Sequence, residues 1–153
     1  MKQSAGILAY RWREGDLEML IAHPGGPFWA HRDDGVWTIP KGETGDGEAP
    51  LLAAKREFSE ELGVRCPEGP FLELGSITQK SGKIVTAWAV ETELDPEAVM
   101  SNTFTMEWPP RSGQEAEFPE IDRVEWASPA RAKAKLNPAQ TELVDRLLQL
   151  VKL

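Results

Sequence analysis

Residues 42–64 read GETGDGEAPLLAAKREFSEELGV, and the interpretation of the whole chain starts from this stretch. Its first six residues include three glycines and no apolar side chain, which predicts a loop from Lys41 to Gly47. Pro50 suits the first turn of a helix, where its missing N–H would be unpaired, and Gly63 suits the end of one. The stretch therefore predicts a loop followed by a helix over residues 48–62.

The predicted helix carries an apolar stripe beside an acidic one. At 100° per residue, the apolar stripe contains Leu51, Ala54, Phe58 and Leu62. The neighbouring stripe contains Glu57, Glu60 and Glu61. Like charges three and four residues apart repel, so packing does not explain the acidic stripe. Taken alone, it is typical of a solvated helix face. A divalent cation gives it a function, because Mg²⁺ prefers carboxylate and carbonyl oxygens.

The same residues resemble a known family. Gly42, Glu48 and residues 56–64, REFSEELGV, fill every position of the Nudix box. The resemblance implies an α/β fold, the Nudix α/β/α sandwich with a mixed central sheet. It also implies a pyrophosphohydrolase that needs Mg²⁺, or Mn²⁺ in its place, and that cleaves a nucleoside diphosphate linked to another group.

The resemblance also assigns roles to individual residues. Glu57, Glu60 and Glu61 correspond to the metal-binding glutamates, and the backbone carbonyl of Lys41 or the backbone of Gly42 would complete the ligand set. Arg56 corresponds to the residue that orients the glutamates, and Glu48 to the glutamate at the helix start. The catalytic set is then Glu48, Arg56, Glu57 and Glu60. Nudix proteins often add a glutamate or glutamine from a later loop, as metal ligand or general base. Here the candidates are Gln114, Glu115, Glu117 and Glu120.

The substrate is indicated by residues 37–43, WTIPKGE. They resemble the lead-in of the nucleoside triphosphate and diadenosine polyphosphate branches, which favours a nucleoside polyphosphate. The diadenosine branch often has a tyrosine downstream of the box, whereas the only tyrosine here is Tyr10, so recognition of the base stays open. Candidate substrate-binding residues are Phe28, Trp37, Lys41 and Lys83. The alternatives are hydrolysis of ADP-ribose or a nucleotide sugar, and a Nudix module that binds a nucleotide without hydrolysing it.

Composition limits the class of protein. The 153 residues are 41% apolar and 27% charged, which predicts a single domain over residues 1–153. The net charge of −8 argues against binding to nucleic acid. Cys66 is the only cysteine, so an internal disulfide is excluded and a cytoplasmic location is expected. No apolar run approaches the length of a membrane span. We expect a small-molecule nucleotide as partner, no membrane, and a monomer or homodimer.

The rest of the chain reads as strands, loops and two further helices. Strands are predicted at 7–12, 17–22, 36–39, 71–78, 84–90, 103–108 and 124–127, for a sheet of about five to seven strands. Loops are predicted at 23–35 and 109–120. His23 and His31 accompany the first loop and are interpreted as surface or internally bonded residues rather than phosphate ligands. Helices are predicted at 129–136 and 138–150, each beginning at a proline.

Overall fold

The fold begins with an antiparallel hairpin, seen in a computed structural model that describes residues 2–151. Strand β1 covers Gln3–Arg13 and strand β2 covers Asp16–Pro24. Glu14 and Gly15 join them with φ values of 54° and 85°. Positive φ at both central positions is the type I′ geometry whose twist matches that of paired strands. The expected hairpin is confirmed, with both strands longer than predicted.

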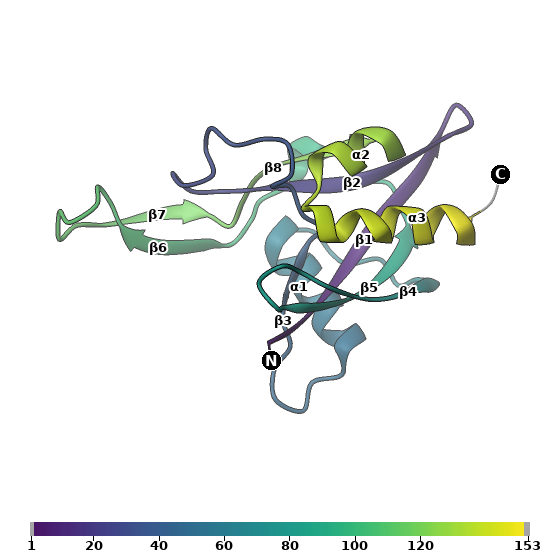
Figure 1. Cartoon of the computed structure of the whole chain (residues 1–153), viewed down its shortest axis with the longest axis horizontal. Coiled ribbons are helices and arrows are strands. Elements are labelled where there is room, and N and C mark those ends of the chain that lie inside the picture. The colour runs from purple at the N-terminus through teal and green to yellow at the C-terminus, as the bar shows by residue number, and fades with distance from the viewer. Residues whose placement is uncertain (1, 152–153) are drawn as a thin grey trace.

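The main sheet has the strand order β4-β5-β1-β2-β8, with β3 paired beside β1 (Figure 1). The remaining strands are β3 (Lys41–Glu43), β4 (Phe71–Thr78), β5 (Ile84–Glu91) and β8 (Ile121–Ala127). β1 runs parallel to β5, and the other pairs are antiparallel, so the sheet is mixed as expected. One side of β1 is divided: its first residues pair with β3 and its last residues with β2.

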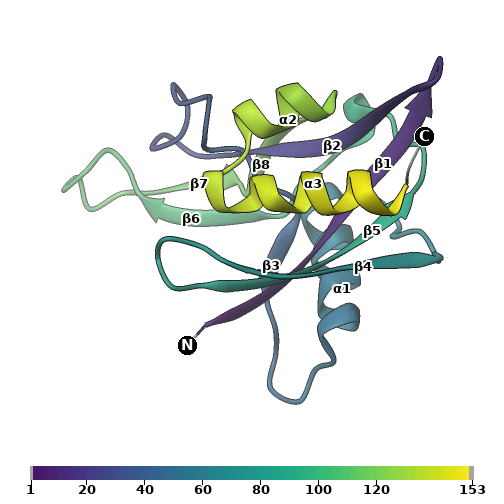
Figure 2. The same cartoon turned by 45° about the vertical axis from the view of Figure 1, so that its right-hand side comes forward.

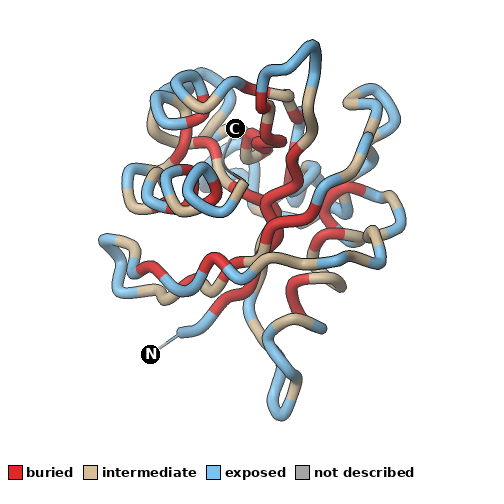
Figure 3. The backbone as a smooth tube through the Cα atoms, turned by 90° about the vertical axis from the view of Figure 1, so that its right-hand side faces the viewer, coloured by how far each residue is buried: buried red, intermediate tan, exposed pale blue. Residues whose placement is uncertain are grey.

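Helices cover both faces of this sheet, which confirms the expected α/β/α sandwich (Figure 2). Helix α1 (Pro50–Leu62) packs on one face, and α2 (Pro129–Lys135) and α3 (Thr141–Leu150) pack on the other. The alternation of side chains along β1 feeds both cores, because Ile7 faces α1 and Leu8 faces α3. Buried residues accordingly follow the central strands and the inner sides of the helices (Figure 3). Within residues 2–151 no helix has the length and apolarity needed to cross a bilayer.

Three boundaries around the glycine-rich loop differ from the prediction. Residues 36–39 form isolated bridges from Trp37 and Thr38 instead of a strand, and the N–H of Ile39 donates to the Gln140 side chain at 3.0 Å. Residues 41–43, predicted as loop, pair with β1 as β3. Helix α1 begins at Pro50 rather than at residue 48. Each difference depends on a partner distant in sequence or on the turn that Glu48 makes with Gly45.

The segment 109–120 is partly a strand, so its prediction as one long loop is wrong. β6 (Thr103–Glu107) and β7 (Glu115–Pro119) form a separate two-stranded ribbon that projects from the sheet (Figure 1). Phe104 lies opposite Phe118, with ring centroids 6.1 Å apart, and the Phe104 ring packs against Gly26. Strand β8 then begins at Ile121, three residues before the predicted start. Two 3₁₀ turns, η1 (Pro96–Ala98) and η2 (Pro138–Gln140), complete the elements, and η2 replaces the start of the last predicted helix.

Strand β4 forms one outer edge of the sheet, and an arginine from α3 covers part of it. Arg146 Nη1 donates to the carbonyl oxygens of Leu74 at 2.8 Å and of Ser76 at 3.0 Å. Gly75 between them has a φ of 82°, and the register with β5 shifts between Glu73 and Gly75, which leaves Leu74 without a partner on β5. This contact ties α3 to the edge strand.

Candidate active site

A pocket of about 360 Å³ opens where β3 meets α1. It is lined by Lys41, Gly42, Glu43, Glu57, Glu60, Glu61, Lys83, Asn102 and Glu120. The residues come from β3, α1, the turn between β4 and β5, and both ends of the ribbon. The fold therefore brings the acidic stripe of α1 together with the segments around Lys41, Lys83 and Glu120.

Gly42 allows the glutamates to lie against the backbone of β3. Its partner across the ladder is Ala5, whose side chain belongs to the core beneath α1, so this position faces the helix. A Cβ atom at Gly42 would lie 2.0 Å from Cδ of Glu57. No side chain fits there without displacing the carboxylate, which explains the need for glycine at this point of close approach.

Arg56 holds three of the glutamates in fixed positions. Its Nε and Nη2 atoms donate to the two carboxylate oxygens of Glu48 at 2.9 and 3.0 Å. Its Nη1 atom donates to Glu57 at 2.8 Å and reaches Glu60 at 3.3 Å. A further bond joins Nη2 to the carbonyl of Glu43 at 3.2 Å and so links the helix to β3. This geometry is the one that an orienting role for Arg56 requires.

Glu48 is stabilised as a carboxylate. The Arg56 guanidinium, together with the N–H of Gly45 at 2.8 Å, lowers the pKa of Glu48 to about 2. Glu48 therefore stays charged at any physiological pH and anchors Arg56 at the helix start.

Glu61 and Glu57 are in the opposite situation. Glu61 is only 8% exposed, and burial, with a further contribution from the charge of Glu57, raises its pKa to about 8. Burial also raises the pKa of Glu57, although Arg56 opposes the effect. Both carboxylates are thus costly to ionise where they stand, and a cation between them would remove that cost. Lys41 lies close enough to lower the pKa of Glu61, but its own pKa is lowered by burial and by Lys83.

Of the four later-loop candidates, Glu120 lies in the pocket, while Gln114, Glu115 and Glu117 lie along the ribbon outside it. Two backbone hydrogen bonds place Glu120: its N–H donates to the carbonyl of Asn102 at 2.9 Å, and the N–H of Asn102 donates to the carbonyl of Glu60 at 3.0 Å. The base of the ribbon is therefore fixed to α1. Asn102 is a pocket residue that the sequence did not indicate, because only this long-range contact brings it to the helix.

The aromatic candidates lie outside the pocket. Trp37 is 2% exposed and donates through Nε1 to Asp33 at 2.7 Å, so it is a core residue and its prediction as a substrate-binding residue is wrong. Phe28 is 59% exposed in the loop after β2, where its ring packs edge-on against Trp29 and beneath Arg32. It is a loop residue without contact to the carboxylates.

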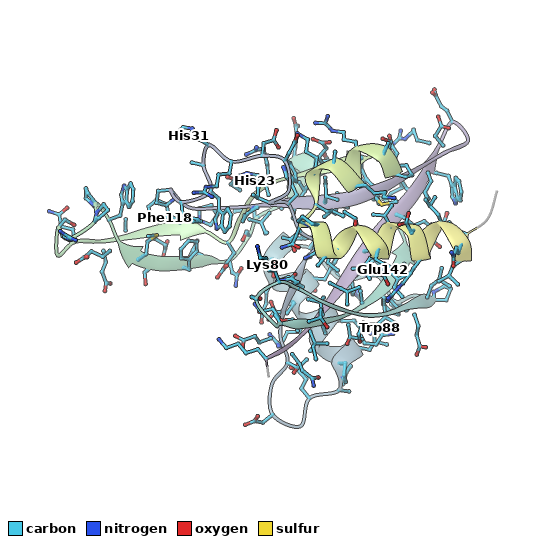
Figure 4. The ribbon with its side chains drawn as sticks, in the orientation of Figure 1. His23, His31, Lys80, Trp88, Phe118 and Glu142 are labelled. Atoms are coloured by element: carbon cyan, nitrogen blue, oxygen red, sulfur yellow. The ribbon has the colours of Figure 1, made fainter. Side chains whose placement is uncertain are left out.

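Neither histidine lines the pocket. Figure 4 shows His23 near the end of β2 and His31 in the loop that follows. His23 is fully buried, with its two ring nitrogens 2.9 Å from the Asp122 carboxylate and 2.7 Å from the Arg32 carbonyl. His31 lies toward the outer end of the loop. The interpretation that each histidine is either internally bonded or on the surface is confirmed, since His23 is internally bonded and His31 is exposed.

The pocket has the chemistry of a site for a hard cation. Its potential ligands are all oxygens, from Glu57, Glu60, Glu61 and Glu120, and two of the carboxylates have raised pKa values. Within residues 2–151 no three His, Cys, Asp or Glu side chains form a ready-made cage, and Arg56 takes up oxygens of Glu57 and Glu60. Mg²⁺ does not need such a cage, since it retains several waters and bridges to substrate phosphates. The residues present therefore fit Mg²⁺.

Comparison with known proteins supports the fold and identifies the family. A family model described as "NUDIX domain" matches residues 3–147, whereas no curated protein matches the chain. An Ap4A hydrolase from C. elegans, solved as a binary complex, is 20% identical with a TM-score of 0.67, over 99% of this chain and 98% of that one. The NUDIX domain of Shewanella oneidensis NrtR, solved with ADP ribose, is 13% identical with a TM-score of 0.67, over 98% of this chain and 88% of that one. The M. smegmatis Nudix hydrolase RenU is 19% identical with a TM-score of 0.59, over 97% of this chain and 84% of that one.

Proposed function

The chain belongs to the NUDIX family, and we propose that it is a Mg²⁺-dependent hydrolase that cleaves the diphosphate linkage of a nucleoside polyphosphate. The observation that carries this proposal is the convergence of Glu57, Glu60, Glu61 and Glu120 on one pocket whose acids are costly to ionise without a cation.

In this proposal the residues of α1 and β3 have distinct tasks. Glu57, Glu60 and Glu61 would hold the metal, with the backbone oxygens of Lys41 and Gly42 completing the ligand set, and Arg56, anchored on Glu48, keeps Glu57 and Glu60 in place. Bound Mg²⁺ supplies charge neutralisation at the phosphate oxygens and lowers the pKa of a coordinated water. Mn²⁺ has the same ligand preferences and would serve in its place.

We assign the general base to Glu120. Within residues 2–151 its carboxylate has no hydrogen bond and no ion pair, while Glu57 and Glu60 are both engaged by Arg56. Glu120 lines the pocket from the base of the ribbon, and its charge lies close enough to Glu57 and Glu61 to contribute to raising the pKa of both. It would therefore be free to accept a proton from an attacking water, a role that leaves the helix glutamates available to hold the metal.

The polyphosphate substrate rests on the lead-in WTIPKGE at residues 37–43 and on the shape shared with the C. elegans Ap4A hydrolase. The S. oneidensis NrtR NUDIX domain, solved with ADP ribose, makes ADP-ribose the second candidate. A module that only binds a nucleotide remains the alternative from another class. The complete set of pocket carboxylates favours the enzyme, because binding alone does not require them all.

The test is a hydrolysis assay with purified protein, Mg²⁺ and a panel of nucleoside triphosphates, diadenosine polyphosphates, ADP-ribose and nucleotide sugars, with products identified by mass. Glu57→Gln and Glu120→Gln should each lower kcat by at least about 100-fold. Glu117→Gln, on the ribbon but outside the pocket, is the matched control and should retain wild-type turnover. Wild-type turnover in Glu57→Gln, or hydrolysis that persists in EDTA, would refute the proposed function.

A further inference from the structure

A second hollow, of about 460 Å³, adjoins the carboxylate pocket. It is lined by Lys2, Ser81, Gly82 and Lys83, and Lys83 also lines the carboxylate pocket. The two cavities therefore share one lysine side chain. The carboxylate pocket is lined by five glutamates and two lysines, whereas the second hollow is lined by two lysines, a serine and a glycine, with no acid.

The described lysines at this boundary make no direct ion pair. Within residues 2–151, neither Lys2, Lys41 nor Lys83 has a carboxylate within ion-pair distance, whereas Lys133 and Lys135 do. Lys83 also lies close enough to Lys41 to lower its pKa. Glu61, Glu57 and Glu43 act to raise the pKa of Lys41 from nearby, but none of them forms an ion pair with a lysine of the described chain. The ammonium groups of Lys2 and Lys83 are therefore available to pair directly with an anionic ligand.

A buried hydrogen-bond network holds the lysine-bearing segments in place. Gln140 is 1% exposed; its Oε1 accepts from the N–H of Ile39, and its Nε2 donates to Thr38 at 3.0 Å and to Gln79 at 2.9 Å. The backbone of Gln79 closes the turn, because its N–H donates to the carbonyl of Lys83 at 2.8 Å. One glutamine thus fixes both the turn that carries Lys83 and the segment that leads into Lys41.

Lys2 is fixed by the sheet. Its carbonyl accepts the N–H of Ile84 at 3.1 Å, which aligns the start of β1 with the residue after Lys83. Gly82 leaves the hollow open, since a Cβ placed there would meet no atom within 4 Å. The lysines therefore border an accessible space on an ordered scaffold.

We propose that this hollow is a subsite for the phosphates beyond the cleaved linkage, with Lys83 as the bridge between the two cavities and Lys2 at the outer end. The inference rests on the proposed function and narrows it: the preferred substrates are nucleotides with three or more linked phosphates, rather than diphosphates capped by an uncharged sugar. Ammonium groups and a hydroxyl are suitable ligands for phosphate oxygens.

The test compares kcat and KM for ADP-ribose and for diadenosine tri-, tetra- and pentaphosphate. Wild-type kcat/KM should rise with the number of phosphates. Lys83→Gln should lower kcat/KM for the pentaphosphate about tenfold, mainly through KM, and that for ADP-ribose by less than about threefold. Lys2→Gln should likewise lower kcat/KM more for the pentaphosphate than for ADP-ribose. Lys80→Gln removes the same charge from the same turn but outside both cavities. It should keep the wild-type ratio of kcat/KM for the pentaphosphate to kcat/KM for ADP-ribose. Thermal unfolding verifies that each variant is folded.

Two results would overturn the subsite while leaving the proposed function intact. One is an equal loss for every substrate in Lys83→Gln and Lys80→Gln, which indicates general electrostatic attraction. The other is a wild-type preference for ADP-ribose. If wild-type protein hydrolyses nothing in the panel, the subsite is tested by calorimetry, which measures binding of inorganic tripolyphosphate in EDTA and does not depend on hydrolysis. Binding that is lost in Lys83→Gln and kept in Lys80→Gln retains the subsite and rejects the proposed function, and equal binding by all three proteins rejects the subsite.

Discussion

Replacing Glu61 by glutamine should make the metal-free protein less sensitive to rising pH. Glu61 has a pKa of about 8 in the folded chain, against an ordinary value of 4.5, chiefly because it is buried. An acid with a raised pKa in the folded state stabilises the fold while it is protonated. Its contribution is present below pH 4.5 and is lost as the pH rises toward 8, because the unfolded chain then releases a proton that the folded chain retains.

The size of the effect follows from the same two values. Between pH 5.5 and 7.5 the unfolded chain ionises Glu61 while the folded chain keeps most of its proton. The free energy of unfolding then falls by about 1.36 kcal/mol per pH unit, or about 2.5 kcal/mol in total. Glutamine has a similar shape and does not titrate, so Glu61→Gln should lack this loss.

Urea unfolding in EDTA at pH 5.5, 6.5 and 7.5 measures the difference. Other titrating groups contribute to both proteins, so the quantity of interest is the difference between the two pH profiles. Glu60→Gln is the matched control, because the Glu60 side chain is 43% exposed on the same helix, and its profile should follow the wild type. Parallel profiles for wild type and Glu61→Gln would refute the claim that burial holds the proton on Glu61.

Three further predictions follow from the site and the core. Gly42→Ala places a Cβ 2.0 Å from Cδ of Glu57 and should lower kcat by at least about 100-fold in a steady-state assay, while circular dichroism shows an intact fold. Binding of Mg²⁺ at pH 7.0 should release close to one proton, because Glu61 must ionise to act as a ligand; calorimetry in two buffers of different ionisation enthalpy measures this, and no release would count against Glu61 as a ligand. Leu147→Ala removes a fully buried side chain of α3 and should cost about 2–5 kcal/mol in urea unfolding, and a cost below about 1 kcal/mol would contradict its place in the core.

Sequence reasoning succeeded where a local signal determines the structure. The bounds of β4 match the predicted 71–78, and Gly63 ends α1 with a φ of 67°. Helical spacing placed the Glu57, Glu60 and Glu61 side chains on one side of α1, and the structure brings all three into one pocket. These features depend on neighbours within a few residues, which is the range over which propensity and periodicity act.

Sequence reasoning failed where a partner distant in the sequence determines the local structure. Residues 41–43 form a strand because they pair with the first residues of β1. Residues 36–39 do not form one, because the N–H of Ile39 donates to the side chain of Gln140. The choice of Glu120 among four candidates depends on how the β6–β7 ribbon leaves the sheet, and the ribbon was not predicted. The protonation of Glu61 depends on its burial, which no pattern of charges in the sequence reports.

The guanidinium of Arg146 has a consequence for self-association. A bare outer strand is a template on which another copy of the chain can extend its ladder, a common start of aggregation. Here the carbonyls of Leu74 and Ser76 are already occupied, and Gly75 distorts the backbone between them. An incoming strand would have to displace the arginine and straighten the bulge, so this margin of the molecule is protected against edge-to-edge pairing.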